Sequence, residues 1–177
     1  NDLEMSADEF VMIRDFILER SGIYFAENKM YLVKNRLAKR MEELQIKTVR
    51  DYFYHVKYDL SMREFNRLMD LVTTNETSFF RDLQPFETLR KDLIPKLMNA
   101  RAGTRQLHIW CAATSSGQEP YTIAMILRDN FPQLVNWSVR IIATDLSDEM
   151  LHRTKEGVYS QFEVNRGLPA KLLVKYF

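Results

Sequence analysis

The first part of the chain repeats apolar residues every three or four positions, which is the spacing of amphipathic helices. Four helices are predicted, beginning at Ser6, at about residue 27, near Thr48 and at Ser61. Ser6 and Ser61 are each followed three residues later by a glutamate, which is the spacing of a capping box. Gly22 is suited to end the first helix. The pattern predicts a small helical domain over residues 1–74.

After residue 74 the pattern changes to alternating helices and strands. A helix is predicted from about residue 86 to 102, kinked by Pro95 and ended by Gly103. A strand over 106–111, a turn of small residues over 112–117 and a helix over 118–130 follow. An apolar β-branched run over 139–144 then leads to a helix that begins at Ser147. This order is typical of the start of a doubly wound, Rossmann-like α/β sheet. Because only two strands precede Phe177, we expect a truncated sheet.

Composition narrows the class of protein. The 177 residues are 46% hydrophobic, which is enough for a packed core, and the formal net charge of +1 disfavours a nucleic-acid binder. The single cysteine, Cys111, excludes an intramolecular disulfide framework and a Cys-rich zinc site, and no metal is expected. No apolar run approaches the roughly 20 residues that span a bilayer, and the N-terminus does not resemble a signal peptide. We therefore expect a soluble, cytoplasmic protein without membrane insertion.

Two features follow the two predicted strands and indicate a ligand site. The turn from Ala112 to Gly117 consists of small residues, which let the backbone approach a ligand closely. Asp145 ends the second strand, where a carboxylate can accept hydrogen bonds from both hydroxyls of a ribose. Either feature alone can be structural, as an ordinary turn or as an acid at a helix N-terminus. Together they favour a nucleoside cofactor, and the absence of G-x-G-x-x-G argues against NAD or FAD.

Three segments resemble the CheR-type chemoreceptor glutamate O-methyltransferases: NETSFFRD at 75–82, IWCAATSSGQEPY at 109–121 and ATDLS at 143–147. The similarity extends along nearly the whole chain, including RGLP at 166–169. It implies S-adenosylmethionine as methyl donor, S-adenosylhomocysteine as product, receptor glutamates as acceptors and chemoreceptor helices as partners. The chain departs from the family at Thr114, where a second cysteine or another small residue is frequent. It also lacks the family's later segments, so we expect this fragment alone to be inactive.

The resemblance also implies the site residues. The positions expected to contact the cofactor or line the transfer site are Asn75, Thr77, Arg81, Ala112, Gly117, Glu119 and Asp145. A carboxylate acceptor is already ionised near pH 7, so no general base is required, and the three histidines are scattered. Arg81 is the candidate catalytic residue, because its planar guanidinium can orient a carboxylate; the alternative is a surface ion pair with Asp82. Phe79 and Phe80 are expected to pack between the two domains.

The second predicted helix carries a basic stripe at Lys29, Arg36, Arg40 and Lys47. It is either a solvated helix face or, as the resemblance favours, a surface for the glutamate-rich helices of a receptor. The expected organisation is a receptor-recognition domain over 1–74, a linker and active-site segment over 75–90, and an incomplete methyltransferase domain over 91–177. The alternative function is a truncated or degenerate module that binds S-adenosylmethionine or S-adenosylhomocysteine without activity.

Overall fold

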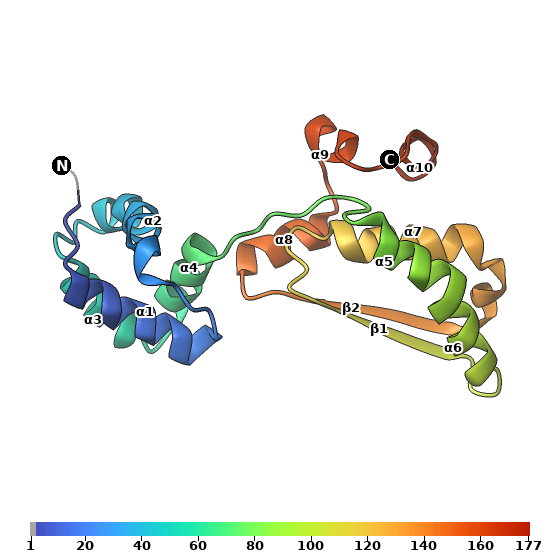
Figure 1. Cartoon of the computed structure of the whole chain (residues 1–177), viewed down its shortest axis with the longest axis horizontal. Coiled ribbons are helices and arrows are strands. Elements are labelled where there is room, and N and C mark those ends of the chain that lie inside the picture. Colours follow the sequence, from blue (N-terminus) through green and yellow to red (C-terminus); the bar gives the residue numbers. More distant parts are fainter. Residues whose placement is uncertain (1–2) are drawn as a thin grey trace. The chain divides into compact units, whose positions relative to one another are not determined.

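The computed structural model describes residues 3–177, which form two compact units (Figure 1). The first unit ends at Thr74, and the second runs from Asn75 to Phe177. The segment 75–90, expected to be a linker and active-site segment, belongs to the second unit. The structure confirms the expected fold class, a helical domain followed by an α/β domain with a small parallel sheet.

The first unit consists of four α-helices around one apolar core. They are α1 (Ala7–Ser21), α2 (Met30–Glu43), α3 (Val49–Lys57) and α4 (Arg63–Val72), with a short 3₁₀ turn, Glu27–Lys29, before α2. Helix α1 packs against α2 and α3, and α4 packs against the same two helices. The apolar stripes meet in the core, where the fully buried side chains include Ile13, Ile17, Val33, Leu37, Tyr52 and Leu68.

Three of the predicted helix boundaries in this unit are confirmed. Ser6 accepts a hydrogen bond from the Glu9 amide, and the Glu9 carboxylate accepts one from the Ser6 amide at 2.9 Å, so both halves of the capping box are present. Gly22 ends α1 in the left-handed conformation with φ 75°. Thr48 caps α3 through its hydroxyl. These local hydrogen bonds satisfy amides that a helix terminus would otherwise leave without partners.

The predicted capping box at Ser61 is wrong. Helix α4 begins at Arg63, after Met62 in the left-handed conformation with φ 59°, and it has no side-chain N-cap. The Ser61 hydroxyl donates to Asp59, and the Glu64 carboxylate turns away from the helix start to bind Arg40. The Asp59 carboxylate accepts the Glu64 amide at 2.8 Å in place of Ser61, and the Glu64 carboxylate has a tertiary partner in Arg40.

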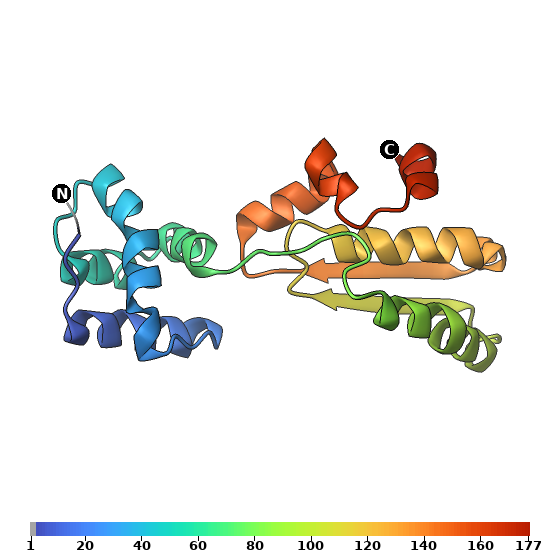
Figure 2. The ribbon, with the colours of Figure 1, turned by 45° about the horizontal axis from the view of Figure 1, so that its top comes forward.

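The second unit contains a two-stranded parallel sheet and several helices (Figure 2). Strands β1 (Gln106–Ala112) and β2 (Ser138–Thr144) pair in register from Gln106 with Ser138 to Ala112 with Thr144. The helices are α5 (Leu83–Thr88), α6 (Ile94–Ala100), α7 (Gln118–Asn130), α8 (Asp148–Glu156), α9 (Gln161–Asn165) and α10 (Ala170–Tyr176). A 3₁₀ helix, Pro132–Asn136, precedes β2.

The helix expected over 86–102 differs from the prediction in its ends and in its middle. It begins at Leu83, passes through a π-helical segment, Leu89–Leu93, and stops at Ala100. Pro95 follows the π segment and has no amide hydrogen to donate, so a regular α-helical ladder cannot continue through it. Gly103 does not cap the helix; the positive φ of this turn, 51°, belongs to Arg105.

One face of the sheet is covered and the other is open in the part of the chain that the structure describes. Leu107 and Cys111 of β1 are buried among apolar residues of α6 and α7. On the opposite face Trp110 is 71% exposed. Phe79 and Phe80 pack into the apolar clusters of the second unit and not between domains, because their neighbours include α7 and the chain after α8.

Candidate functional site

The register of the sheet brings the small-residue turn and Asp145 together. Ala112 pairs with Thr144, so both strands end at the same level. The Asp145 carboxylate accepts the amide of Ser115 at 2.7 Å and the amide of Ser147 at 2.9 Å. Each oxygen can accept a further hydrogen bond, because a carboxylate oxygen has two acceptor sites. The carboxylate is therefore held in place with acceptor capacity remaining.

The turn itself adopts a backbone conformation that is uncommon for residues with side chains. Ala113 and Ser115 have φ values of 55° and 50°, and Gly117 has a φ of 95°. A Cβ at Gly117 would lie 2.9 Å from Thr154 Cγ2 and 2.9 Å from the Tyr159 hydroxyl. Left-handed non-glycine residues persist where the surrounding structure holds them, and they cluster at functional sites. A glycine is therefore required at position 117, because of its positive φ and because a Cβ would collide with Thr154 and Tyr159.

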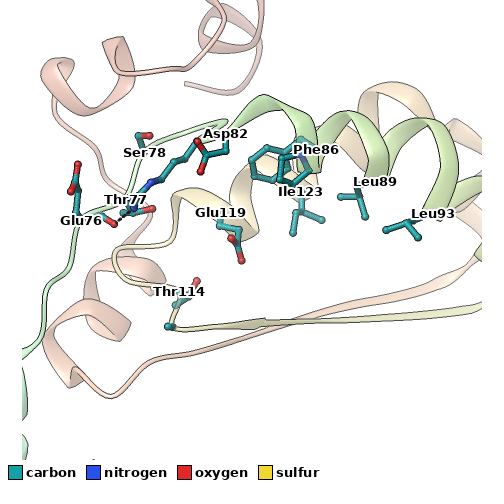
Figure 3. Close-up of a pocket in the computed structure, with 13 residues that line it drawn as sticks. Glu76, Thr77, Ser78, Asp82, Phe86, Leu89, Leu93, Thr114, Glu119 and Ile123 are labelled. Atoms are coloured by element: carbon teal, nitrogen blue, oxygen red, sulfur yellow. Dashed lines mark hydrogen bonds between the residues drawn. The ribbon is translucent and has the colours of Figure 1, made fainter. Parts of the chain in front are cut away.

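A cavity of about 390 Å³ opens beside this turn (Figure 3). One side is formed by the irregular segment before α5, and the other by the turn and the start of α7. The lining residues are Glu76, Thr77, Ser78, Arg81, Asp82, Pro85, Phe86, Leu89, Leu93, Ala113, Thr114, Glu119 and Ile123. The cavity thus combines an apolar wall with a cluster of charged and hydroxyl groups, which is the usual make-up of a small-molecule site.

The charged groups of the cavity have an excess of negative charge. Asp82 and Glu119 lie around a single cation, Arg81, whereas the charge of Glu76 is balanced by its ion pair with Arg166. A hydrogen bond from Arg166, the charge of Arg166 and the charge of Arg81 all lower the pKa of Glu76, so this carboxylate is ionised at neutral pH. Such a cavity favours a cationic ligand group, and the sulfonium and ammonium groups of S-adenosylmethionine are cationic.

Thr114 carries a buried hydroxyl that lacks a partner within residues 3–177. The residue is 2% exposed, lines the cavity, and its Oγ1 atom makes no hydrogen bond in this part of the chain. Figure 3 shows its side chain and that of Glu119 directed towards each other. A buried hydroxyl without a partner costs about 1–3 kcal/mol, so a polar ligand group or a water molecule is expected beside it. The cavity therefore fits a polar, positively charged cofactor.

The structure brings together only some of the residues expected to bind the cofactor. Thr77, Arg81 and Glu119 line the cavity. The four that do not line it are Asn75, Ala112, Gly117 and Asp145. Asn75 adjoins the turn, since its carbonyl accepts the Ser115 hydroxyl at 2.9 Å. The sequence did not predict the wall formed by Phe86, Leu89 and Leu93, because their apolar spacing is indistinguishable from that of an ordinary core helix.

Arg81 is oriented by the backbone of its own segment. Its side chain is exposed at the cavity, and one guanidinium nitrogen donates to the Glu76 carbonyl at 2.7 Å. Within residues 3–177 it forms no ion pair with Asp82, the alternative that the sequence left open. No other hydrogen bond of the Arg81 guanidinium is formed within residues 3–177, and the side chain lines the cavity. Its remaining donors are available to a carboxylate.

The described residues do not favour a cysteine nucleophile or a metal ion at this site. Burial, with the nearby charge and hydrogen bond of Glu119, raises the pKa of Cys111 to about 11, so its thiol is protonated and a poor nucleophile at neutral pH. Among residues 3–177, no three His, Cys, Asp or Glu side chains form a group that could hold a metal ion. No helix over the same residues is long and apolar enough to cross a bilayer.

The basic stripe of the first unit is largely engaged in contacts within that unit. The Arg36 guanidinium binds the carbonyls of Val72 and Thr73 at the end of α4. The Arg40 guanidinium forms a bidentate pair with Glu64, at 2.9 and 2.5 Å, and a further bond to Glu43 at 3.0 Å. Lys29 and Lys47 are exposed outside α2. Two members of the stripe therefore hold the helices together, and two face solvent.

Comparison with known proteins agrees with this geometry. Residues 75–177 match the family described as "CheR methyltransferase, SAM binding domain", in which SAM denotes S-adenosylmethionine. Residues 8–73 match "CheR methyltransferase, all-alpha domain". The chain belongs to the CheR methyltransferase family. This finding confirms the resemblance carried by the three sequence segments, and it does not support the alternative of an inactive binding module.

Individual CheR relatives show the same similarity. The chain is 41% identical to chemotaxis protein methyltransferase 1 of Pseudomonas aeruginosa over 174 residues, which are 96% of this chain and 62% of that protein. It is 40% identical to chemotaxis protein methyltransferase Cher2 of Pseudomonas putida, again over 96% of this chain and 62% of the relative. For chemotaxis protein methyltransferase 2 of Vibrio cholerae the identity is 32%, over 100% of this chain and 61% of the relative. The chain thus spans about three fifths of the length of these relatives.

Proposed function

We propose that the complete gene product transfers a methyl group from S-adenosylmethionine to glutamate carboxylates of chemoreceptors. The observation that carries this proposal is the cavity lined by Arg81, Thr77 and Glu119. It lies beside a turn whose Ser115 amide is hydrogen-bonded to Asp145. The family match supports a methyltransferase, and the names of the relatives support a role in chemotaxis. The glutamate acceptor is the finer part of the proposal.

The residues of the site divide into those that would hold the cofactor and those that would hold the acceptor. Asp145 would accept hydrogen bonds from the ribose hydroxyls with the acceptor sites that Ser115 and Ser147 leave unused. Glu119 and the Thr114 hydroxyl offer polar partners inside the cavity. When bound, S-adenosylmethionine supplies an electrophilic methyl group on a positively charged sulfur.

The protein's contribution to the reaction is positioning and exclusion of water. A glutamate carboxylate is ionised near pH 7 and is a nucleophile without help from a base. Arg81 can hold such a carboxylate with its planar fork, and the apolar wall at Phe86 and Leu89 keeps water away from it. Correct orientation of two bound reactants can supply up to about 7–11 kcal/mol of the barrier.

The acceptor chemistry can be tested through the stability of the product. The complete gene product is incubated with methyl-labelled S-adenosylmethionine and the cytoplasmic helices of a receptor, and the labelled receptor is then exposed to alkali. A glutamate methyl ester hydrolyses under alkali and releases volatile methanol, whereas methyl groups on nitrogen remain bound. We expect volatile label, and no label on receptors whose methylated glutamates are replaced by alanine. Alkali-stable label would contradict the proposed acceptor.

We further propose that the receptor approaches the first unit at the basic stripe. Lys29 and Lys47 supply its solvent-exposed charge, while Arg36 and Arg40 hold α2 against α4. Exposed charges act mainly on the rate of encounter and on orientation, and salt screens them. Receptor binding through this surface should therefore weaken as ionic strength rises.

The charge of Lys29 should matter more than an equal charge on α2 outside the stripe. Lys29→Glu is expected to raise the KM for receptor by about three- to tenfold at low salt, because reversal of one exposed charge changes a surface interaction by about 1 kcal/mol. Steady-state methylation at varied receptor concentration measures the effect. Lys39→Glu makes the same charge change at an exposed position about 80° around the helix from the stripe and serves as control. Equal KM values for the two variants would refute this receptor surface.

A further inference from the structure

The segment that carries Arg81 has no regular structure to hold it. Residues 74–78 form neither helix nor strand, and Phe80 and Asp82 have positive φ values of 50° and 56°. Its geometry must therefore come from tertiary contacts. Two of these are hydrogen bonds from the neighbouring turn and helix: Ser115 Oγ donates to the Asn75 carbonyl at 2.9 Å, and the Phe80 amide donates to Thr122 Oγ1 at 3.2 Å.

A third contact comes from the loop after α9. Gly167 has a φ of 94°, and a Cβ built on it would lie 2.1 Å from the carbonyl oxygen of Phe79. The two backbones therefore touch in a way that only glycine permits. Val164 and Leu168 fix the loop from both sides, since they pack with the fully buried Phe79 ring. The loop and the Arg81 segment are therefore in direct contact.

Arg166, in the same loop, binds Glu76. Its guanidinium donates to the Glu76 carboxylate at 2.7 Å, while the Glu76 carbonyl accepts the Arg81 guanidinium at the same distance. One residue thus has its side chain bound to one arginine and its backbone to the other. The Glu76 carboxylate also lies close enough to Arg81 for that charge to lower its pKa. Without Arg166, this carboxylate would have Arg81 as its nearest cation.

We propose that Arg166 is a positioning residue that keeps the Glu76 carboxylate away from Arg81. By occupying Glu76, it leaves the Arg81 guanidinium free for the carboxylate of a substrate or cofactor. Both side chains of the pair are about half exposed, 52% and 54%, so the pair itself adds little to stability. Its effect is to prevent the Glu76 carboxylate from binding Arg81. The proposal rests on the proposed function, because it assigns Arg81 a ligand carboxylate.

A pair of substitutions separates this role from a simple structural one. Arg166→Ala releases Glu76 to bind Arg81 and is expected to lower kcat/KM for methyl transfer by about tenfold or more. Glu76→Gln removes the competing charge and is expected to stay within about threefold of the unmodified protein. The double variant, Glu76→Gln with Arg166→Ala, is expected to recover to the level of Glu76→Gln. A salt bridge that merely supports the fold predicts that the two single variants are impaired to a similar extent, with no recovery in the double variant.

The assays are steady-state methylation, titration with S-adenosylhomocysteine and the melting temperature of each variant. Lys175→Ala is the control, because Lys175, 51% exposed, also forms an ion pair in this unit, with Asp129, and its loss should leave turnover unchanged. Normal activity of Arg166→Ala, a double variant as impaired as Arg166→Ala, or unfolding of Arg166→Ala would overturn the proposal. Failure of the unmodified protein to bind S-adenosylhomocysteine would instead refute the proposed function.

Discussion

Arg81→Ala is expected to lower the rate of methyl transfer by about 10²–10³-fold, which is the usual effect of removing one preorganised charged donor from an active site. The guanidinium lines the cavity, and its one hydrogen bond within residues 3–177 goes to the Glu76 carbonyl. The side chain is exposed, so its loss should change the melting temperature little. Single-turnover methylation with saturating cofactor measures the chemical step.

Two further variants sharpen the interpretation of Arg81→Ala. Arg81→Lys keeps the charge but not the planar fork, and an intermediate rate is expected if orientation of a carboxylate matters. Arg101→Ala removes an exposed arginine from the turn after α6 and should leave the rate unchanged. Turnover at the unmodified rate in Arg81→Ala would exclude the proposed role of this residue.

The second large effect is expected in the first unit, where Glu64→Ala should lower the free energy of unfolding by about 3 kcal/mol. The Glu64 side chain is only 7% exposed, and it binds both the Arg40 guanidinium and the buried Tyr52 hydroxyl, the latter at 3.0 Å. Removal of this carboxylate leaves a buried hydroxyl and a partly buried cation without their partner. Amide hydrogen exchange over α3 and α4 should accelerate by about 100-fold.

Glu43→Ala is the matched control for Glu64→Ala. Its carboxylate binds the same Arg40 guanidinium at 3.0 Å, but the side chain is 42% exposed. An exposed pair of this kind contributes at most about 1 kcal/mol. Equal exchange rates in the two variants would show that burial of the Arg40–Glu64 pair is unimportant.

The same pair predicts how stability depends on pH. Burial alone would raise the pKa of Glu64, but hydrogen bonds from Arg40 and Tyr52, with the positive charge of Arg40, lower it below the usual value of 4.5. A carboxyl group with a lowered pKa in the folded state stabilises the fold above its unfolded pKa. That stabilisation is lost as the pH falls through the folded pKa. The first unit should therefore lose stability below about pH 4.5, and Glu64→Ala should show less of this loss.

Local hydrogen bonding accounts for what sequence predicted well. The caps at Ser6, Thr48 and Ser147 involve partners within three residues, so pattern alone locates them. The predicted cap at Ser61 is wrong because Asp59 takes the Glu64 amide and because the Glu64 carboxylate has a partner 24 residues away on α2, which no local pattern contains. For the same reason, the sequence could not show that Arg40, a member of the predicted basic stripe, is bound by Glu64.

The candidate site likewise combines residues that sequence motifs identify with contacts that only the fold creates. Thr77, Arg81 and Glu119 could be predicted because they lie in recognisable motifs, and they do line one cavity. The strand register that places Asp145 against the turn also followed from the order of elements. The contact between Gly167 and Phe79, and the double engagement of Glu76, depend on a loop 90 residues further along the chain. Only the folded structure shows that these groups meet.

The central claim is that the cavity beside the Ala112–Gly117 turn takes an adenosyl cofactor. Isothermal titration of the complete gene product with S-adenosylhomocysteine tests it most directly, with Asp145→Asn as the comparison. The account predicts one molecule bound per chain with a Kd below about 100 µM, and at least about tenfold weaker binding by the variant. Absence of binding at millimolar ligand, or equal affinity in the variant, would contradict it.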